Sequence, residues 1–345
     1  MQAPLHYDLI LKSMPFLSAT LQVAQDMEEE ALHKTIFQAF SDTLTRFEVL
    51  SLAYFERSSR QTFVLGPWFQ TLLEHTSLEV LDETYEVHLP YKGFYISLPE
   101  FEGKVWSQYL KKHLPLRGLY VFQLKSAPVI CLFFWGQEEG PMNNCPQGAV
   151  GGLAVDLSKA YMHPQSLFGY LTEAVTTLSE SFRFGCLFWE SKKPDVTTRQ
   201  SVLKAATIAF NLIYYLSMEK TETRHITRRN RRRERLMENL EKSNPTRALR
   251  IQKEMTQMPR KMNVTYVGES YEQNKAKAIS PTSGGRPSPK QHWVRGHYRT
   301  YQKGPQGKTR FVRMWIKPFL RGDPVLGTVD QRMYKVGGEK KLEES

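Results

Sequence analysis

Two stretches of the chain concentrate side chains that bind phosphate groups. In the first, six of eight consecutive residues are arginine: Arg228, Arg229, Arg231, Arg232, Arg233 and Arg235. A charge run of this kind is often a solvated helix face, but six like charges so close together repel one another unless an anion is near. We therefore expect this run to contact nucleic acid or ribosomal RNA.

The second stretch lies near the carboxyl terminus and predicts two β-strands joined by a turn. HWVRGHYRTY (292–301) and TRFVRMWIKPFL (309–320) are separated by QKGPQGK, whose Gly and Pro residues favour a turn. Alternation places one set of residues on a single face of the first strand: Trp293, Arg295, His297, Arg299 and Tyr301. It places a second set on one face of the other strand: Phe311, Arg313, Trp315 and Lys317.

If these two faces coincide, aromatic rings interleave with guanidinium groups, which stack on bases and bind phosphates. The residues expected to bind RNA or the ribosome here are Arg295, His297, Arg299, Arg310 and Arg313. The alternative is that Trp293 and Trp315 pack the hairpin on the body, because an isolated hairpin is only marginally stable in water. Gly296 indicates a bulge or a close approach of the backbone.

The two histidines of this stretch have the chemistry for acid–base cleavage of RNA, since imidazole titrates near neutral pH. His292 and His297 are five residues apart on one expected strand, so they point to opposite faces, and we expect no shared catalytic pair. The sequence also lacks a glycine-rich phosphate loop and the ligand spacing of a zinc site. We therefore expect no catalytic residue, metal or cofactor; a ribonuclease using His297 with Arg295 and Arg299 is the enzymatic alternative.

The net charge is divided unevenly along the chain. The protein of 345 residues carries +12 in total, of which residues 1–220 contribute −5 and residues 221–345 contribute +17. Clustered Lys and Arg gain free energy by releasing counterions from phosphates. The sequence thus indicates an acidic body with a polyanion-binding carboxy-terminal region.

The elements that must position these residues follow from hydrophobic periodicity. Apolar spacing predicts helices within 9–56 and over 68–81, 165–183 and 199–221. Short β-branched and aromatic runs predict strands at 93–99, 117–124, 128–135 and 149–157. The connector 125–127 is too short for a parallel crossover, so we expect a meander. The predicted fold is α+β: an antiparallel or mixed sheet flanked by helices, followed by a basic helix and a C-terminal β-hairpin.

Composition divides the chain into four parts. We expect an α+β globular domain at 1–221 and a basic segment at 222–260 that is helical by propensity up to Pro245. A linker rich in Pro, Ser and Gly follows at 261–290, and the hairpin module with its tail occupies 291–345.

Three features predict a cytoplasmic protein with no membrane partner. Cys131, Cys145 and Cys186 form no disulfide framework, and Cys131 lies in an apolar strand, as a core residue would. The apolar run 205–216 is interrupted by Asn211 and is too short to cross a bilayer, so it predicts a buried helix. The first twenty residues lack the charge order of a secretory signal.

The segment RPSPKQHWVRGHYRTYQKGPQGKTRFVRMWIKPFLRG (286–322) resembles the terminal signature of the type V-A anti-CRISPR family that suppresses production of the Cas effector nuclease. VHLPYKGFYISLP (87–99) is similar to a strand segment of that family, and the apolar run 205–216 stands where members have an aromatic-rich helix. The motif carries over to Arg286, Pro287, His292, Arg295, Gly296, His297, Tyr298, Arg313 and Trp315. The chain departs from the motif at Trp293-Val294, where members have Arg, and at Tyr298, which replaces Trp.

The resemblance implies a non-enzymatic regulator encoded on a phage or plasmid. Members are described as recognising the amino-terminal nascent peptide of the effector during translation and causing loss of its messenger RNA. The expected partners are therefore the nascent Cas effector peptide, its mRNA or ribosome, and a host nuclease that degrades the message. Besides the ribonuclease, the remaining alternative is a phage DNA- or RNA-binding protein without a CRISPR role.

Overall fold

The computed structural model describes residues 7, 11, 17, 21, 24, 27–78, 89–108, 110–124, 128–137, 148–162, 167–177, 186–190, 194–218, 221–256, 261–271, 290–303, 310–321 and 323–328. The chain divides into two compact units. The first comprises Met1–Glu74 and Leu78–Tyr271, and the second comprises His75–Ser77 and Glu272–Ser345.

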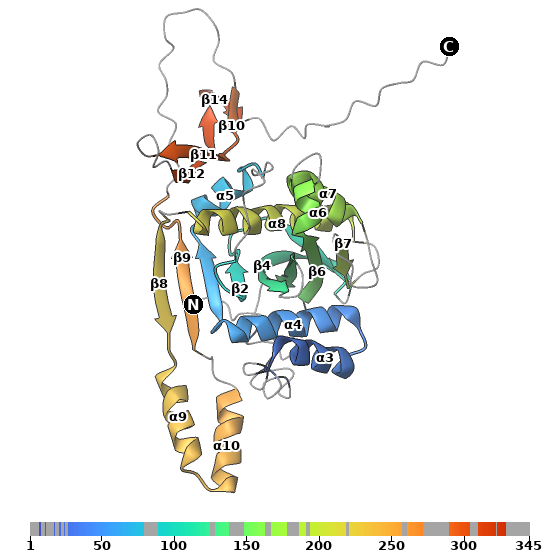
Figure 1. The fold of residues 1–345 in the computed structure, drawn as a ribbon, viewed down its shortest axis with the longest axis vertical. Coiled ribbons are helices and arrows are strands. Elements are labelled where there is room, and N and C mark those ends of the chain that lie inside the picture. Colours follow the sequence, from blue (N-terminus) through green and yellow to red (C-terminus); the bar gives the residue numbers. More distant parts are fainter. Residues whose placement is uncertain are drawn as a thin grey trace, which may run out of the picture. The chain divides into compact units, whose positions relative to one another are not determined.

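The first unit is built on a nine-stranded mixed sheet, whose main path runs β7-β6-β5-β4-β2-β1-β9-β8, with β3 paired to β4 (Figure 1). The strands are β1 (Gln61–Leu65), β2 (Gly93–Ser97), β3 (Lys104–Ser107), β4 (Lys112–Leu124), β5 (Val129–Gln137), β6 (Gly148–Asp156), β7 (Cys186–Trp189), β8 (Thr223–Arg228) and β9 (Met262–Val267). The predicted strands β2, β4, β5 and β6 pair antiparallel in that order, and β7, which was not expected, extends this meander. Strand β1 pairs in parallel with β2 and with β9.

Helices cover both faces of this sheet. They are α3 (Glu29–Ala39), α4 (Thr43–Arg57), α5 (Pro67–Glu74), α6 (Leu157–Met162), α7 (Leu167–Thr176) and α8 (Val196–Leu216). Two further helices, α9 (Arg231–Glu241) and α10 (Pro245–Thr256), extend away from the sheet beyond β8 and β9 (Figure 1). Figure 1 shows α3 and α4 on one side of the sheet and α5 to α8 on the other. On the α4 side, the ring of Tyr54 stacks on that of Phe122 at 4.9 Å between centroids.

Burial on both faces explains why the central strands are apolar at every position. All residues of β5 are buried, so both sets of its alternating side chains face a covered surface. Cys131 of this strand is buried with a free thiol, as expected for a core residue, and its burial raises the pKa of the thiol.

The long helix α8 is buried along most of its 21 residues. Asp195 caps its amino-terminal end, where the carboxylate accepts a hydrogen bond from the Thr198 amide at 2.7 Å. Asn211, the polar residue in the apolar run, donates from Nδ2 to the carbonyl oxygen of Leu73 in the last turn of α5, at 2.8 Å. No helix within the described ranges is long and apolar enough to cross a membrane.

Within its described residues the second unit contains five short strands: β10 (Lys290–Val294), β11 (His297–Lys303), β12 (Arg310–Ile316), β13 (Phe319–Arg321) and β14 (Asp323–Thr328). Strand β10 lies between β13 and β14, while β11 and β12 form the predicted antiparallel hairpin. The segment His75–Ser77 joins this unit through a parallel bridge between Thr76 and Gly296.

The α+β class is confirmed, with a mixed sheet flanked by helices and a carboxy-terminal hairpin. The structure differs from the sequence-based expectation at both ends of the basic segment. Residues 223–228, expected to be helical, form strand β8, and residues 262–267, expected in the linker, form strand β9. Both segments carry β-branched residues that suit paired strands, and here tertiary pairing outweighs the helical propensity of their charged residues.

Candidate functional site

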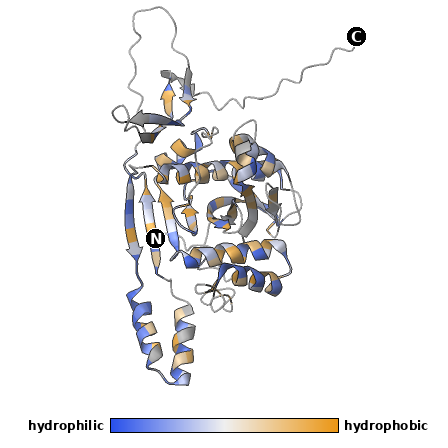
Figure 2. Cartoon of the chain, viewed as in Figure 1, coloured by the Kyte–Doolittle hydropathy of each residue, from blue (hydrophilic) through white to orange (hydrophobic). Residues whose placement is uncertain are grey.

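The arginine-rich run continues from strand β8 into a two-helix hairpin, α9–α10, which we call the arm. Asn230 caps α9 by accepting a hydrogen bond from the Arg233 amide at 3.1 Å, and Asn244 caps α10 by accepting one from the Arg247 amide at 2.9 Å. The predicted end of the helix at Pro245 is instead the start of α10, since proline is well tolerated at the first helical position. The pale and blue colouring of α9 in Figure 2 shows how hydrophilic it is.

A small set of contacts holds the two helices of the arm together. Ile251 and Met255 of α10 are buried. Arg232 forms an ion pair with Glu254 at 2.5 Å, and Arg233 donates to the carbonyl oxygen of Met255. Two arginines of the run therefore position α9 against α10.

The other arginines of the run differ in their surroundings. Arg228, on β8, donates to the hydroxyl of Tyr266 at 2.8 Å. Arg229, Arg231 and Arg235 are exposed, and their side chains make no hydrogen bond or ion pair with any residue the structure describes. These three guanidinium groups face solvent.

Arg224, on the same strand as Arg228, also forms contacts within the fold. Its guanidinium donates twice to the Glu269 carboxylate, at 2.7 and 2.6 Å, and lies 4.5 Å from the centroid of the Tyr266 ring. These hydrogen bonds from Arg224 hold the pKa of Glu269 below its ordinary value.

In the second unit, the predicted strand 292–301 is two strands. The backbone breaks at Arg295–Gly296, so Trp293 lies on β10 whereas His297, Arg299 and Tyr301 lie on β11. The predicted face containing all of them is therefore wrong. Gly296 explains the break, because its backbone pairs with His75 and Ser77 and a Cβ there would lie 2.5 Å from Pro318 Cδ. The predicted close approach of the backbone at Gly296 is confirmed.

The register of the hairpin also separates the two mixed faces that we expected to coincide. Arg299 lies opposite Met314, and Tyr301 lies opposite Val312. Arg313 and Trp315 lie opposite Thr300 and Tyr298, on the other face. The hairpin thus exposes Arg299, whose guanidinium lies 5.0 Å from the centroid of the Tyr301 ring, without Arg313 or Trp315 beside it.

Both tryptophans contact the segment His75–Ser77. Trp315 is buried and donates from Nε1 to the Thr76 hydroxyl at 3.1 Å. The ring of Trp293 lies 4.2 Å from that of His75 between centroids, at an angle of 32°. Both rings therefore make contacts within the second unit, while Arg295 and Arg299 are exposed.

The remaining motif residues give no catalytic arrangement. His292 lies on β10 opposite Arg321, while His297 lies on β11 opposite Ile316. Arg310 begins β12, and Arg286 and Pro287 lie outside the described residues. Among the described residues no group of three His, Cys, Asp or Glu side chains is arranged to hold a metal ion.

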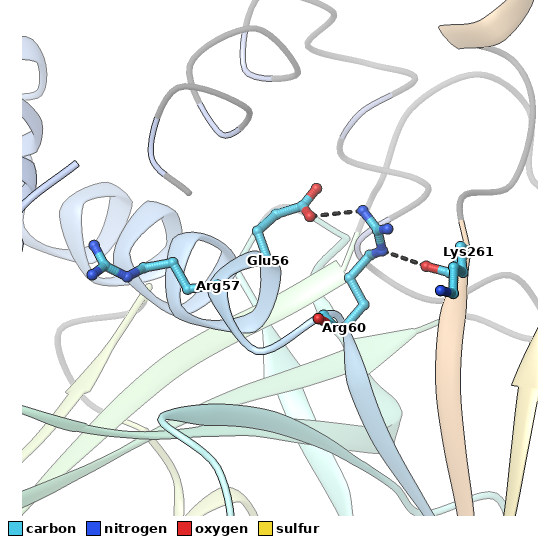
Figure 3. Close-up of a pocket in the computed structure, with 5 residues that line it drawn as sticks. Glu56, Arg57, Arg60 and Lys261 are labelled. Atoms are coloured by element: carbon cyan, nitrogen blue, oxygen red, sulfur yellow. Dashed lines mark hydrogen bonds and ion pairs between the residues drawn. The ribbon is translucent and has the colours of Figure 1, made fainter. Parts of the chain in front are cut away.

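A hollow that no sequence pattern indicates lies in the first unit, between the end of α4 and the start of β9. A cavity of about 320 Å³ is lined by Glu56, Arg57, Ser59, Arg60 and Lys261 (Figure 3). Arg60 bridges its sides, through an ion pair with the buried Glu56 at 2.7 Å and a hydrogen bond to the Lys261 carbonyl oxygen. Ser59 and Arg60 have positive φ because they close the carboxyl end of α4, where their amides donate to the carbonyls of Glu56 and Phe55.

A second cavity of about 400 Å³ shares Arg57 and Ser59 with the first and reaches strand β8. We call it the β8 hollow; its lining is Arg57, Ser58, Ser59, Gln61, Tyr91, His225, Ile226, Thr227, Asn263, Val264 and Thr265. Its polar groups are linked across the strands: Thr265 Oγ1 accepts from Gln61 at 2.7 Å and lies 2.8 Å from His225 Nδ1. The partial alternation of polar and apolar residues in MNVTYV is the one local sequence signal for these strands, since TRHITR holds a single apolar residue.

Comparison with known proteins identifies a family. A family model, AcrVA2-like, described as the anti-CRISPR type V subtype A2 family, matches residues 63–321. No curated protein matches the chain. A solved structure described as "Crystal structure of AcrVA2" shares 12% sequence identity, with a TM-score of 0.41 over 90% of this chain and 96% of that chain. Because the family model spans both the sheet and the carboxy-terminal strands, the chain belongs to the AcrVA2-like anti-CRISPR type V subtype A2 family.

Proposed function

We propose that this protein, encoded on a mobile genetic element, recognises the nascent amino-terminal peptide of a type V-A Cas nuclease and lowers the level of its mRNA. Membership of the anti-CRISPR family is the observation that carries the proposal. The partners are the nascent peptide, the translating ribosome with its message, and a host nuclease that removes the message, all in the cytoplasm.

The edge strand β8 supports the proposal that the protein binds an extended peptide. In the described part of the chain β8 pairs with β9 and with no other strand, and five of its six residues are exposed. An extended peptide can add to such an edge, where main-chain hydrogen bonds supply affinity and pockets for alternate side chains supply specificity. The β8 hollow lies against this strand and has the volume of a small ligand pocket.

The arm supports contact with RNA. It follows β8 and precedes β9 in the chain, so the proposed peptide edge and the exposed arginines belong to one unit. A peptide emerging from the ribosome is close to RNA, so a protein that reads it gains from a phosphate-binding surface.

A reporter assay tests whether the peptide is what is read. The protein is expressed beside a reporter fused to the amino-terminal codons of the effector in three forms: native, synonymously recoded, and frameshifted with the frame restored downstream. We expect reporter mRNA to fall for the native and recoded forms, which encode the same peptide, and to stay constant for the frameshifted form. Unchanged reporter mRNA for the native form would refute the proposal. Unchanged mRNA for the recoded form would refute it too, because that form encodes the same peptide.

A further inference from the structure

The arm and the residues that lead into it carry more positive charge than ion pairs within the fold neutralise. Residues 228–256 hold ten Lys and Arg but four Glu. Five arginines of this segment are exposed and make no side-chain hydrogen bond or ion pair with the residues the structure describes: Arg229, Arg231, Arg235, Arg247 and Arg250. Arg232 and Arg233 instead join α9 to α10.

The positions of the arginines on α9 oppose the stability of the helix. Arg231, Arg232 and Arg233 occupy its first turn, where the helix macrodipole favours anions and disfavours cations. Arg231 and Arg235 are four residues apart, so two like charges lie on one helix face. A polyanion bound to this face would offset both unfavourable terms, whereas packing within the arm compensates Arg232 and Arg233 but leaves the Arg231–Arg235 pair.

The composition of the arm restricts the kind of nucleic acid it can bind. Residues 231–256 contain no Phe, Tyr, Trp or His, so the two helices have no ring on which an unpaired base could stack. Arginines without such rings bind phosphates and position a protein on a nucleic-acid double helix without recognising the base sequence. The chemistry therefore fits the backbone of a double-helical nucleic acid.

We propose that the arm binds double-helical RNA through its phosphates, without sequence preference, by means of Arg229, Arg231, Arg235, Arg247 and Arg250. The choice of RNA over DNA rests on the proposed function, in which the protein acts on a message being translated. Arg232 and Arg233 are positioning residues that orient α9 against α10. Double-helical segments of ribosomal or messenger RNA supply the ligand.

The first test measures binding of the full-length chain to a 20-base-pair RNA duplex, to the same-length single-stranded RNA and to the matching DNA duplex. Five phosphate contacts contribute about 4.5 to the slope of log K against log salt, which corresponds to about 500-fold weaker binding at 200 mM than at 50 mM. We expect the RNA duplex to bind most tightly, with a K that does not depend on its sequence. Tighter binding of single-stranded RNA or of duplex DNA would overturn the proposal.

Variants then assign the binding to the arm. The triple variant R229Q/R231Q/R235Q should lower the salt slope by about 3, whereas K34Q/K92Q/K104Q, which removes three exposed charges elsewhere in the same unit, should leave it almost unchanged. Circular dichroism checks that each variant keeps its helices. A slope that falls equally in both triple variants would show that net charge, and not the arm, determines binding.

Single substitutions of two neighbouring arginines on α9 distinguish arginines that contact phosphates from those that position the helix. R231Q should lower the slope by about 1, while R232Q should change it less, because the charge of Arg232 is already paired with Glu254. E254Q should raise the slope by freeing Arg232, but E238Q, which removes an exposed carboxylate of α9 that forms no ion pair with a described residue, should not. Equal slopes for R231Q and R232Q would contradict the division into contacting and positioning arginines.

The outcomes separate this inference from the function on which it rests. If the arm binds duplex RNA but the frameshifted reporter is silenced as well as the native one, the proposed peptide reading fails and the arm assignment stands. If the reporter responds to the native peptide alone but the triple arm variant binds duplex RNA as tightly as the unmodified chain, the arm assignment fails and peptide reading stands.

Discussion

At the scale of single residues, Asn211 shows how one polar side chain serves a buried helix. The last carbonyls of α5 lack partners within their own helix, and Asn211 of α8 donates to that of Leu73. We expect N211L to lower the free energy of unfolding by about 1–3 kcal/mol although leucine is more apolar, because the carbonyl stays buried without its donor. Urea unfolding of the full chain measures this change.

Thr207 on the same helix provides the control for Asn211. Its hydroxyl donates only to the carbonyl of Leu203 in α8 itself, at 2.9 Å, and that carbonyl belongs to the helix ladder. T207V should therefore cost less than about 1 kcal/mol. Equal losses for N211L and T207V would show that Asn211 does not hold α5 against α8.

Asp195 gives the fold a pH dependence at the start of α8. Burial raises the pKa of its carboxyl, but hydrogen bonds from Thr198 and His113 outweigh this effect and leave the pKa below its ordinary value. A carboxyl with a lowered pKa stabilises the fold above its unfolded pKa, and this stabilisation is lost as the pH falls through the folded value. D195N keeps an oxygen that can cap the helix, so it isolates the contribution of the charge.

At pH 7 we expect D195N to be less stable than the unmodified chain by about 0.3–1 kcal/mol, the effect of an anion at a helix amino terminus. The two should begin to converge as the pH falls below the unfolded Asp pKa of about 4, and should meet only below the lowered folded pKa, where the native carboxyl becomes protonated. Denaturant titrations at a pH of about 7, 5 and 2 measure the difference. A gap that persists at the lowest pH would assign the stabilisation to hydrogen-bond geometry and not to charge.

At the scale of elements, periodicity predicts the body well because its elements are long or strongly apolar. The four predicted strands correspond to β2, β4, β5 and β6, and the predicted run 199–221 corresponds to α8. Strand β8 escapes prediction because arginines dominate the composition around it, and β9 because its pairing partners β1 and β8 are distant in the chain.

The sequence predicts the candidate site only in part. Composition identifies the arginine run, but the contacts of Arg232 and Arg233 depend on α10 folding back over α9. The hairpin face was mispredicted because alternation was continued through Gly296, where the backbone breaks. The β8 hollow joins residues from β1, β8 and β9, so no local pattern can reveal it.

Strand β8 allows a test of the peptide edge with two threonines on one face. Thr223 and Thr227 are four residues apart on β8, but only Thr227 lines the hollow. T227W should fill the hollow and weaken binding of a synthetic effector amino-terminal peptide at least 10-fold, whereas T223W should leave it within about 2-fold. Fluorescence anisotropy with the full-length chain measures both. Equal affinities for the two variants would remove the hollow from the proposed peptide site.

At the scale of the whole molecule, the positive charge of the carboxy-terminal region is distributed over elements for which we propose different functions. Part of the positive charge of the carboxy-terminal region is used inside the fold, as in the pairs Arg224–Glu269 and Arg232–Glu254. The exposed remainder includes the arm arginines of the first unit and Arg295 and Arg299 of the second. The proposed peptide binding and the proposed polyanion binding would therefore depend on different side chains, so mutation can separate them.

This separation predicts a variant that recognises its target without acting on it. R229Q/R231Q/R235Q retains β8 and its hollow, so it should bind the effector peptide within about 2-fold of the unmodified chain. It should nevertheless fail to lower reporter mRNA, because three lost phosphate contacts weaken association with a ribosome by well over 10-fold at physiological salt. Peptide anisotropy and quantitative PCR of the reporter message, on the same variant, measure the two effects. Full loss of mRNA with this variant would mean that peptide binding alone is sufficient, and the arm would then have no part in silencing.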